Sequence, residues 1–186
     1  MLEQGFIWSG SEAKLTVHPE HRWHADRPGE AELDYKRIKT MIYLDVVTKE
    51  TGCMRVIPGS HRRPLHIDLE PLITQKEDST LITFGITGQD MPFFPLATQP
   101  GDVAFFNHCL WHSVFNGWAG RRYIALKFAA KPTTDAHIAS LRRWSPYAFG
   151  PDEAFLNSPD PCIRRMVENL VELGKNGIGL QNDKIM

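Results

Sequence analysis

The sequence predicts a mainly β fold, a β-sandwich or jelly roll followed by helices at its C-terminal end. Short apolar segments with alternating faces recur between Arg37 and Ala129, and turns containing glycine or proline separate them. Apolar residues at helical spacing are found after Lys131. Strands and helices do not alternate between Arg37 and Ala129, so a parallel α/β fold is not expected.

The composition is that of an ordinary globular protein, with 186 residues, 42% hydrophobic residues and a net charge of −1. This length suits one domain over residues 1–186, with barrel strands in 1–130 and helices in 131–186. The even charge balance gives no reason to expect nucleic acid as a partner. No apolar run reaches the roughly 18 residues of a membrane span, and no signal peptide is recognisable. The three cysteines lack CxxC spacing, so we expect a cytoplasmic protein without a disulfide framework.

The N-terminal part predicts two strands, residues 5–8 and 13–17, on either side of a turn at Ser9–Ser11. His18 and His21 follow in a polar segment with a proline, and we interpret both as solvated turn residues, with metal ligands as the alternative because they precede His24 at HxxHxxH spacing. The next apolar positions belong to a short strand around Trp23, and a polar loop is expected after it, up to Lys36.

The strongest strand pattern covers Arg37–Asp45, where Lys39, Met41 and Tyr43 share one face. Residues 61–77 are predicted to be a connecting segment whose basic cluster is solvated, with recognition of an acidic substrate as the alternative. Further strands are expected over residues 53–57, 81–84, 93–96, 103–106, 109–115 and 121–129. The Asn116-Gly117 dipeptide predicts a tight turn with positive φ.

Two helices are predicted near the C-terminus. Thr134 can cap a helix that runs through Trp144. Asp160-Pro161 begins another, and its apolar residues recur at helical spacing until Gly174. We interpret this apolar stripe as a packing face.

His24 and Asp26 are the first candidates for chemistry, because alternate side chains of a strand project to one face, roughly 7 Å apart. An imidazole and a carboxylate are two thirds of the 2-His-1-carboxylate triad that holds non-haem Fe(II). The missing histidine is predicted to be His112, on a later strand. His108 is the alternative, because His108 and His112 lie four residues apart and would suit a zinc site if they lay on a helix. The β-branched and aromatic residues around them disfavour a helix.

An arginine pair begins the strand after His112 and predicts an anion site. A guanidinium binds a carboxylate through two parallel hydrogen bonds. Because side chains alternate along a strand, either Arg121 or Arg122 can point inward, and an exposed pair is the alternative.

Several motifs occur in a recognisable order: Trp23-His24-Ala25-Asp26, residues 41–45 (MIYLD), residues 52–61 (GCMRVIPGSH), residues 101–106 (GDVAFF), and His112 followed by Asn116 and Arg121. In this order, from about Arg22 to Phe128, the chain resembles the phytanoyl-CoA dioxygenase family of Fe(II)- and 2-oxoglutarate-dependent oxygenases.

The resemblance implies a double-stranded β-helix, a cupin-like jelly roll with iron inside one mouth. His24, Asp26 and His112 match the family's iron ligands, and Arg121 matches the arginine that pairs with the side carboxylate of 2-oxoglutarate, with Arg122 as the off-register alternative. The implied cofactors are Fe(II), 2-oxoglutarate as co-substrate, and O2. The implied reaction is hydroxylation of a small organic substrate with release of succinate and CO2. We expect Lys39 and Tyr43 to supply further polar contacts.

The chain departs from the family pattern in ways that affect the pocket. The long helical region that usually precedes the HxD motif is expected to be absent, so one pocket wall would be missing or supplied by another subunit, which makes a homo-oligomer an expectation. Val114 stands where a small hydroxyl residue often helps to hold 2-oxoglutarate, and Ala25 replaces a frequent glutamine.

Two other functions remain open from the sequence. One is a cupin-like metalloenzyme that keeps the triad but does not use 2-oxoglutarate, and the other is a non-catalytic ligand-binding barrel. In each case the expected partner is a small molecule, without nucleic acid or membrane.

Overall fold

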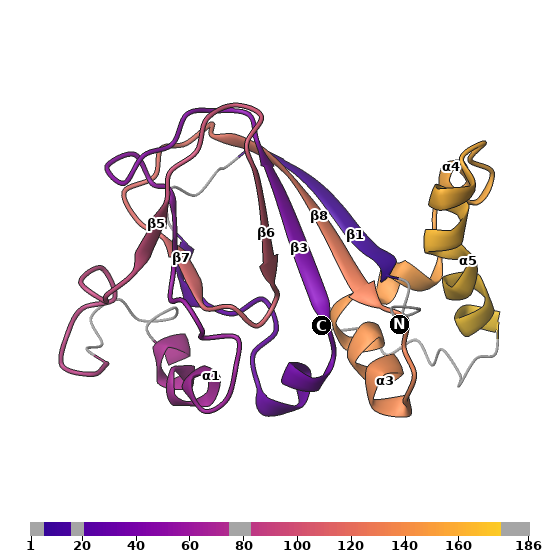
Figure 1. Ribbon diagram of the computed structural model, residues 1–186, viewed down its shortest axis with the longest axis horizontal. Coiled ribbons are helices and arrows are strands. Elements are labelled where there is room, and N and C mark those ends of the chain that lie inside the picture. The colour runs from indigo at the N-terminus through magenta and orange to yellow at the C-terminus, as the bar shows by residue number, and fades with distance from the viewer. Residues whose placement is uncertain (1–5, 16–20, 75–82, 176–186) are drawn as a thin grey trace, which may run out of the picture. The chain divides into compact units, whose positions relative to one another are not determined.

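The computed structural model describes residues 6–15, 21–74 and 83–175. These residues form two β-sheets with some helices, as predicted (Figure 1). The chain divides into a central unit, Ser11–Lys127, and a second unit made by the described residues on either side of it. That residues 1–186 work as one domain stays a prediction. No helix in the described ranges has the length and apolar character needed to cross a membrane.

The first sheet contains the strand predicted most strongly, β3 (Arg37–Tyr43). Its strand order is β1-β8-β3-β6, with β1 at Phe6–Leu15, β8 at Arg122–Ala130 and β6 at Val103–Asn107. β3 and β6 pair antiparallel, and Met41 lies opposite Ala104. The β-branched and aromatic residues of these segments suit a pleated, half-buried surface.

The second sheet is built from shorter strands. Its order is β2-β7-β4-β5, with β2 at His21–His24, β7 at His112–Val114, β4 at Met54–Val56 and β5 at Phe94–Leu96. β7 pairs antiparallel with both β2 and β4. The chain therefore passes repeatedly from one sheet to the other along the sequence (Figure 1).

Two separate apolar clusters hold the central unit together. One contains Met41, Tyr43, Met54 and Phe106, from β3, β4 and β6, which belong to different sheets. The other is built around Trp23 and Trp111 and packs against the helical segments α1 (Leu65–Asp68) and η2 (Glu70–Ile73) through buried leucines, Leu69 and Leu72. A further short 3-10 helix, η1, spans Glu30–Asp34.

The second unit contains the predicted helices. They are α3 (Asp135–Trp144), η3 (Pro146–Phe149), α4 (Glu153–Leu156) and α5 (Pro161–Lys175). The side chain of Thr134 accepts a hydrogen bond from the His137 N–H, which confirms the predicted cap. Val167 and Leu170 of α5 are fully buried, so the apolar stripe is a packing face as expected.

Several local predictions were wrong. β1 runs unbroken through Ser9–Ser11, where a turn was expected, and the part of the expected second strand beyond Leu15 lies outside the described residues. Residues 65–73 form α1 and η2 instead of an irregular connection, because two of their leucines are buried under the second sheet. The strand expected over 81–84 is reduced to an isolated bridge between Thr83 and Ile86, and residues 81–82 are not described.

Candidate metal centre

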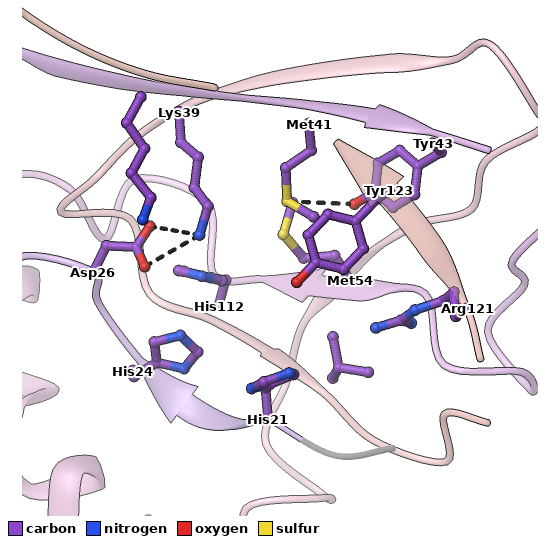
Figure 2. Close-up of a pocket in the computed structure, with 12 residues that line it drawn as sticks. His21, His24, Asp26, Lys39, Met41, Tyr43, Met54, His112, Arg121 and Tyr123 are labelled. Carbon is purple, nitrogen blue, oxygen red and sulfur yellow. Dashed lines mark hydrogen bonds and ion pairs between the residues drawn. The ribbon is translucent and has the colours of Figure 1, made fainter. Parts of the chain in front are cut away.

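A pocket of about 150 Å³ lies in the central unit between the two sheets (Figure 2). Its walls come from β2, β7 and β4 of the second sheet on one side and from β3 and β8 of the first sheet on the other. The residues that line it are His21, His24, Asp26, Lys39, Met41, Tyr43, Met54, His112, Val114, Arg121, Tyr123 and Lys127. Most of the candidates predicted from the sequence are among them.

His24, Asp26 and His112 converge at one end of this pocket. Their potential ligand atoms all lie within 4.8 Å of one another. In the described part of the chain, these are the three His, Cys, Asp or Glu side chains that are close enough together to hold a metal ion. Strand pairing explains the meeting, because His24 of β2 lies directly opposite His112 of β7. The imidazole rings are 4.3 Å apart between centroids. Asp26 lies in the bend just after β2, not on the strand itself as predicted.

Side-chain alternation separates the ligands from the hydrophobic core. Trp23 and Ala25 point away from the pocket into the tryptophan cluster, while His24 and Asp26 face it. Ala25 is thus a core residue here, and a longer polar side chain at its place would not face the pocket.

His21 also lines the pocket, although the sequence interpretation placed it in a solvated turn. Strict alternation would send His21 to the opposite face from His24. A register irregularity of the kind seen at β-bulges lies between the two, and it returns His21 to the pocket side. The sequence carries no readable signal for this bulge. His18 lies outside the described residues.

Backbone carbonyls fix the tautomers of both histidines. Nδ1 of His24 is 2.6 Å from the carbonyl oxygen of Arg22, and Nδ1 of His112 is 2.8 Å from that of Leu110. A carbonyl only accepts, so in each ring Nδ1 donates its proton, and in the neutral ring Nε2 is the nitrogen that carries the lone pair. Histidines that bind metals are oriented in this way by their second nitrogen.

Lys39 contacts both oxygens of the Asp26 carboxylate, at 3.0 and 3.2 Å (Figure 2). Burial by itself would raise the pKa of Asp26, but the charge of Lys39, helped by the three nearby histidines, outweighs it and holds that pKa well below its usual range. The carboxylate is therefore ionised at neutral pH and is available as a ligand.

Burial keeps His112 neutral. It lowers the pKa of His112 to about 3, helped by the charge of His24 and opposed by that of Asp26. The ring of Phe106 packs edge-on against it, with centroids 5.1 Å apart, and restricts its orientation. A neutral, oriented imidazole is the form that binds a metal.

Arg121 lines the same pocket and is only 4% exposed. Burial lowers its pKa, and the neighbouring Tyr43 and Tyr123 oppose that shift. One guanidinium nitrogen donates to the carbonyl of Gly52. Gly52 has a positive φ, and a Cβ there would collide with the backbone of Gly117, so the glycine lets the turn that precedes Arg121 approach closely. Asn116 in this turn has the predicted positive φ.

Arg122 points away from the pocket. Its side chain is exposed and pairs with Asp45 at 2.7 Å. Strand alternation thus sends Arg121 inward and Arg122 outward, which separates the two alternatives that the sequence left open.

Tyr43 is buried in the pocket wall, where its hydroxyl donates to the sulfur of Met41 at 3.9 Å. Burial raises its pKa to about 12. Tyr123 and Lys127 of β8 belong to the same wall, and Met54 of β4 lies on the opposite sheet; these three lining residues were not singled out from the sequence. The alternation of β8, which places Tyr123 and Lys127 on one face, was the signal that could have found two of them.

Two other histidine interpretations are settled by the geometry. His112 lies on β7 and His108 in the preceding turn, so the helix that would pair them for zinc does not form. His66 is fully buried, and its Nδ1 lies within 3.1 Å of two backbone carbonyls, those of Ser60 and Cys109. It is a structural residue and not part of a solvated basic cluster.

The donor set fits a divalent metal. Two imidazoles, of which His112 is neutral, and one ionised carboxylate meet within ligand distance, and these three donors lie together at one end of the pocket. The chemistry of this set suits non-haem Fe(II).

Sequence comparison matches residues 9–116 to phytanoyl-CoA dioxygenase (PhyH). The chain belongs to the phytanoyl-CoA dioxygenase family. The resemblance read from the motifs is thereby confirmed. A curated relative, the dioxygenase lolE1 of Epichloe uncinata, is 32% identical over 89 residues, which are 48% of this chain and 31% of lolE1. The match thus spans about a third of the length of that relative.

Solved structures share the fold of this family member. HygX from Streptomyces hygroscopicus, in its apo form, has a TM-score of 0.51 at 14% identity. HygX with nickel and 2-oxoglutarate bound has a TM-score of 0.50 at 16% identity. Both alignments cover 72% of this chain and 62% of HygX.

Proposed function

We propose that this protein is an Fe(II)- and 2-oxoglutarate-dependent dioxygenase that hydroxylates a small organic substrate and releases succinate and CO2. The observation that carries the proposal is the convergence of His24, Asp26 and His112 in a pocket that also contains a buried arginine. Bound there, iron together with 2-oxoglutarate would supply the activation of O2 and the oxidation of a C–H bond.

The fold supports this assignment. We infer a double-stranded β-helix from the two four-stranded sheets, whose orders are β1-β8-β3-β6 and β2-β7-β4-β5, and from the likeness to HygX. In this arrangement the strands that carry the triad, β2 and β7, are neighbours, and the strand that follows Arg121, β8, faces them across the pocket. HygX itself has been solved with nickel and 2-oxoglutarate bound.

The three ligands would be held ready by their own contacts. The carbonyls of Arg22 and Leu110 orient His24 and His112 with Nε2 toward the pocket. Lys39 holds the Asp26 carboxylate through both oxygens, and one oxygen would remain with Lys39 when the other binds the metal. Support of this kind keeps a carboxylate in one orientation.

Arg121 would bind the far carboxylate of 2-oxoglutarate. Its guanidinium is anchored by the Gly52 carbonyl, and its burial excludes water, which strengthens a charge-assisted bond. Figure 2 shows Arg121 at the end of the pocket away from Asp26, so a dicarboxylate could reach from one to the other. Tyr43 lies beside the guanidinium and could contribute a hydroxyl.

Val114 lines the pocket where a hydroxyl residue is frequent in the family, and it offers no hydrogen bond. The hydroxyl of the adjacent Ser113 is buried and has no hydrogen-bond partner among the described residues. Ser113 does not line the pocket, so the co-substrate would depend on the other contacts. A second subunit closing the pocket belongs to this proposal as well.

The test is the absorption spectrum of the anaerobic protein on addition of Fe(II) and 2-oxoglutarate. A visible charge-transfer band that is absent in Asp26→Ala supports the proposal. Iron binding without this band would favour a metalloenzyme that does not use 2-oxoglutarate. A folded protein that takes up no metal would favour a non-catalytic barrel. Succinate release with a library of small organic molecules then identifies the substrate.

A further inference from the structure

The ammonium group of Lys39 occupies one particular side of the Asp26 carboxylate. Its Nζ atom is 3.0 Å from one side-chain oxygen and 3.2 Å from the other, so it is nearly equidistant from the two (Figure 2). A metal ion that is chelated by both oxygens of a carboxylate also lies nearly equidistant from them. Two cations cannot share this position, because they repel each other strongly at short range. With Lys39 in place, a metal can therefore reach Asp26 through one oxygen.

A second contact fixes the ammonium group at this place. Lys39 lies on β3 directly opposite Phe106 of β6, and its Nζ atom is 5.8 Å from the centroid of the Phe106 ring. This distance is within the range of a cation–π interaction. The Lys39 side chain is only 14% exposed, which limits the positions open to it. The same aromatic ring packs edge-on against His112, so one ring contacts both Lys39 and a candidate metal ligand.

The number of oxygens that Asp26 contributes decides how much of the metal stays open, and here the inference rests on the proposed function. A six-coordinate metal that takes one atom from each of three side chains keeps three positions for other groups. The keto-acid end of 2-oxoglutarate would chelate the metal through two atoms, and one position would remain. A second oxygen from Asp26 would fill that remaining position.

We propose that Lys39 is a positioning residue that restricts Asp26 to binding the metal through one oxygen and thereby keeps the last coordination position open. Its effect is exerted through Asp26. The same ammonium group repels the metal, so Lys39 lowers the affinity of the site for the metal while it keeps that position open.

The proton relaxation of water around the Mn(II)-loaded protein tests this without turnover, because the relaxivity rises with the number of exchangeable waters on the metal. The wild type, without 2-oxoglutarate, should show the relaxivity of about three waters. Lys39→Met should lower it by roughly a third, because the second oxygen of Asp26 then replaces one water. Lys36→Met, at an exposed lysine outside the pocket, is the control and should keep the value of the wild type.

The affinity for Mn(II) separates this role from a merely supporting one. Lys39→Met should bind Mn(II) about tenfold more tightly, because chelation by two oxygens becomes possible and the repelling charge is gone. Loss of a contact that only supported a ligand would instead weaken binding by about 10- to 100-fold. Lys39→Arg should restore the water number and affinity of the wild type, since a guanidinium keeps the charge and can pair with both oxygens.

The inference is overturned if the wild type shows about two waters, a result that does not depend on whether Lys39→Met folds. It is also overturned if Lys39→Met keeps the water number of the wild type or binds Mn(II) more weakly. In each of these outcomes, Mn(II) binding that is lost in His112→Ala leaves the proposed function intact. Failure of the wild type to bind Mn(II), or equal binding by His112→Ala, overturns the proposed function and this inference together.

Discussion

The two faces of the β2–β7 pair differ completely in chemistry, although alternating residues of the same two chain segments build both. On one face, Trp23 and Trp111 are fully buried in an apolar cluster. On the other, His24 and His112 meet Asp26 at a pocket. Neighbouring residues in the sequence thus have opposite roles, one stabilising the fold and the next positioned for chemistry. The comparison shows how firmly strand register must be held, because a slip of one residue would exchange the two faces.

The largest effect is expected on the tryptophan face. Trp23→Ala should lower the free energy of unfolding by about 3–5 kcal/mol, because it leaves a cavity and removes the indole hydrogen bond to the Gly88 carbonyl. Urea denaturation measures this loss. His21→Ala, on the same strand but at the pocket, should cost less than about 1 kcal/mol. Equal losses for the two variants would contradict the division between the faces.

On the pocket face, His112→Ala should affect metal binding much more than folding. Loss of a ligand should weaken Ni(II) binding by more than about 100-fold, since loss of a supporting contact alone costs about 10- to 100-fold. Calorimetric titration of the apo protein gives the affinity. His61→Ala, at a histidine outside the pocket, is the matched control and should bind nickel like the wild type. Unchanged nickel affinity in His112→Ala would show that the metal binds elsewhere.

His108 offers a pH-dependent contrast, because neither of its ring nitrogens has a hydrogen-bond partner among the described residues. Burial lowers its pKa from 6.5 to about 3, so between these values the unfolded chain takes up a proton that the folded protein excludes. Its contribution to stability is present above pH 6.5 and is lost as the pH falls toward 3. At pH 5, 1.5 units below 6.5, the loss should be about 2 kcal/mol.

Urea titrations at pH 8 and pH 5 measure this loss. Between these two pH values, the free energy of unfolding of His108→Leu should fall by about 2 kcal/mol less than that of the wild type, whatever the stability of the variant at pH 8. The difference in free energy of unfolding between the two proteins should stay constant above about pH 7.5, which is one unit above the ordinary histidine pKa. Identical acid slopes in the two proteins would show that His108 does not titrate as described.

The smallest effect sharpens the contrast between adjacent arginines. Arg121→Lys should weaken 2-oxoglutarate binding to the Ni(II)-loaded protein by about tenfold, because an ammonium cannot form the paired bonds of a guanidinium. Arg122→Lys should leave the affinity unchanged, since Arg122 is exposed and pairs with Asp45. Titration calorimetry gives both values, and a loss confined to Arg122→Lys would reverse the assignment.

The sequence by itself determined the strands with clear alternation, above all β3, the capped helix α3 and the packing stripe of α5. It also identified the three residues of the candidate metal centre, because the order of its motifs resembles the phytanoyl-CoA dioxygenase family; residue type and spacing by themselves left His108 as an alternative to His112. The strands and helices depend on spacing along a few residues, and the chain carries that information locally.

The tertiary structure alone decided the rest. The pairing of β2 with β7, between residues far apart in the chain, set the meeting of His24 and His112. The bulge that turns His21 into the pocket and the inward orientation of Arg121 depend on the partner strands. Secondary-structure propensity is local. Strand register, burial and the contact of Lys39 with the Asp26 carboxylate arise only when distant segments pack together.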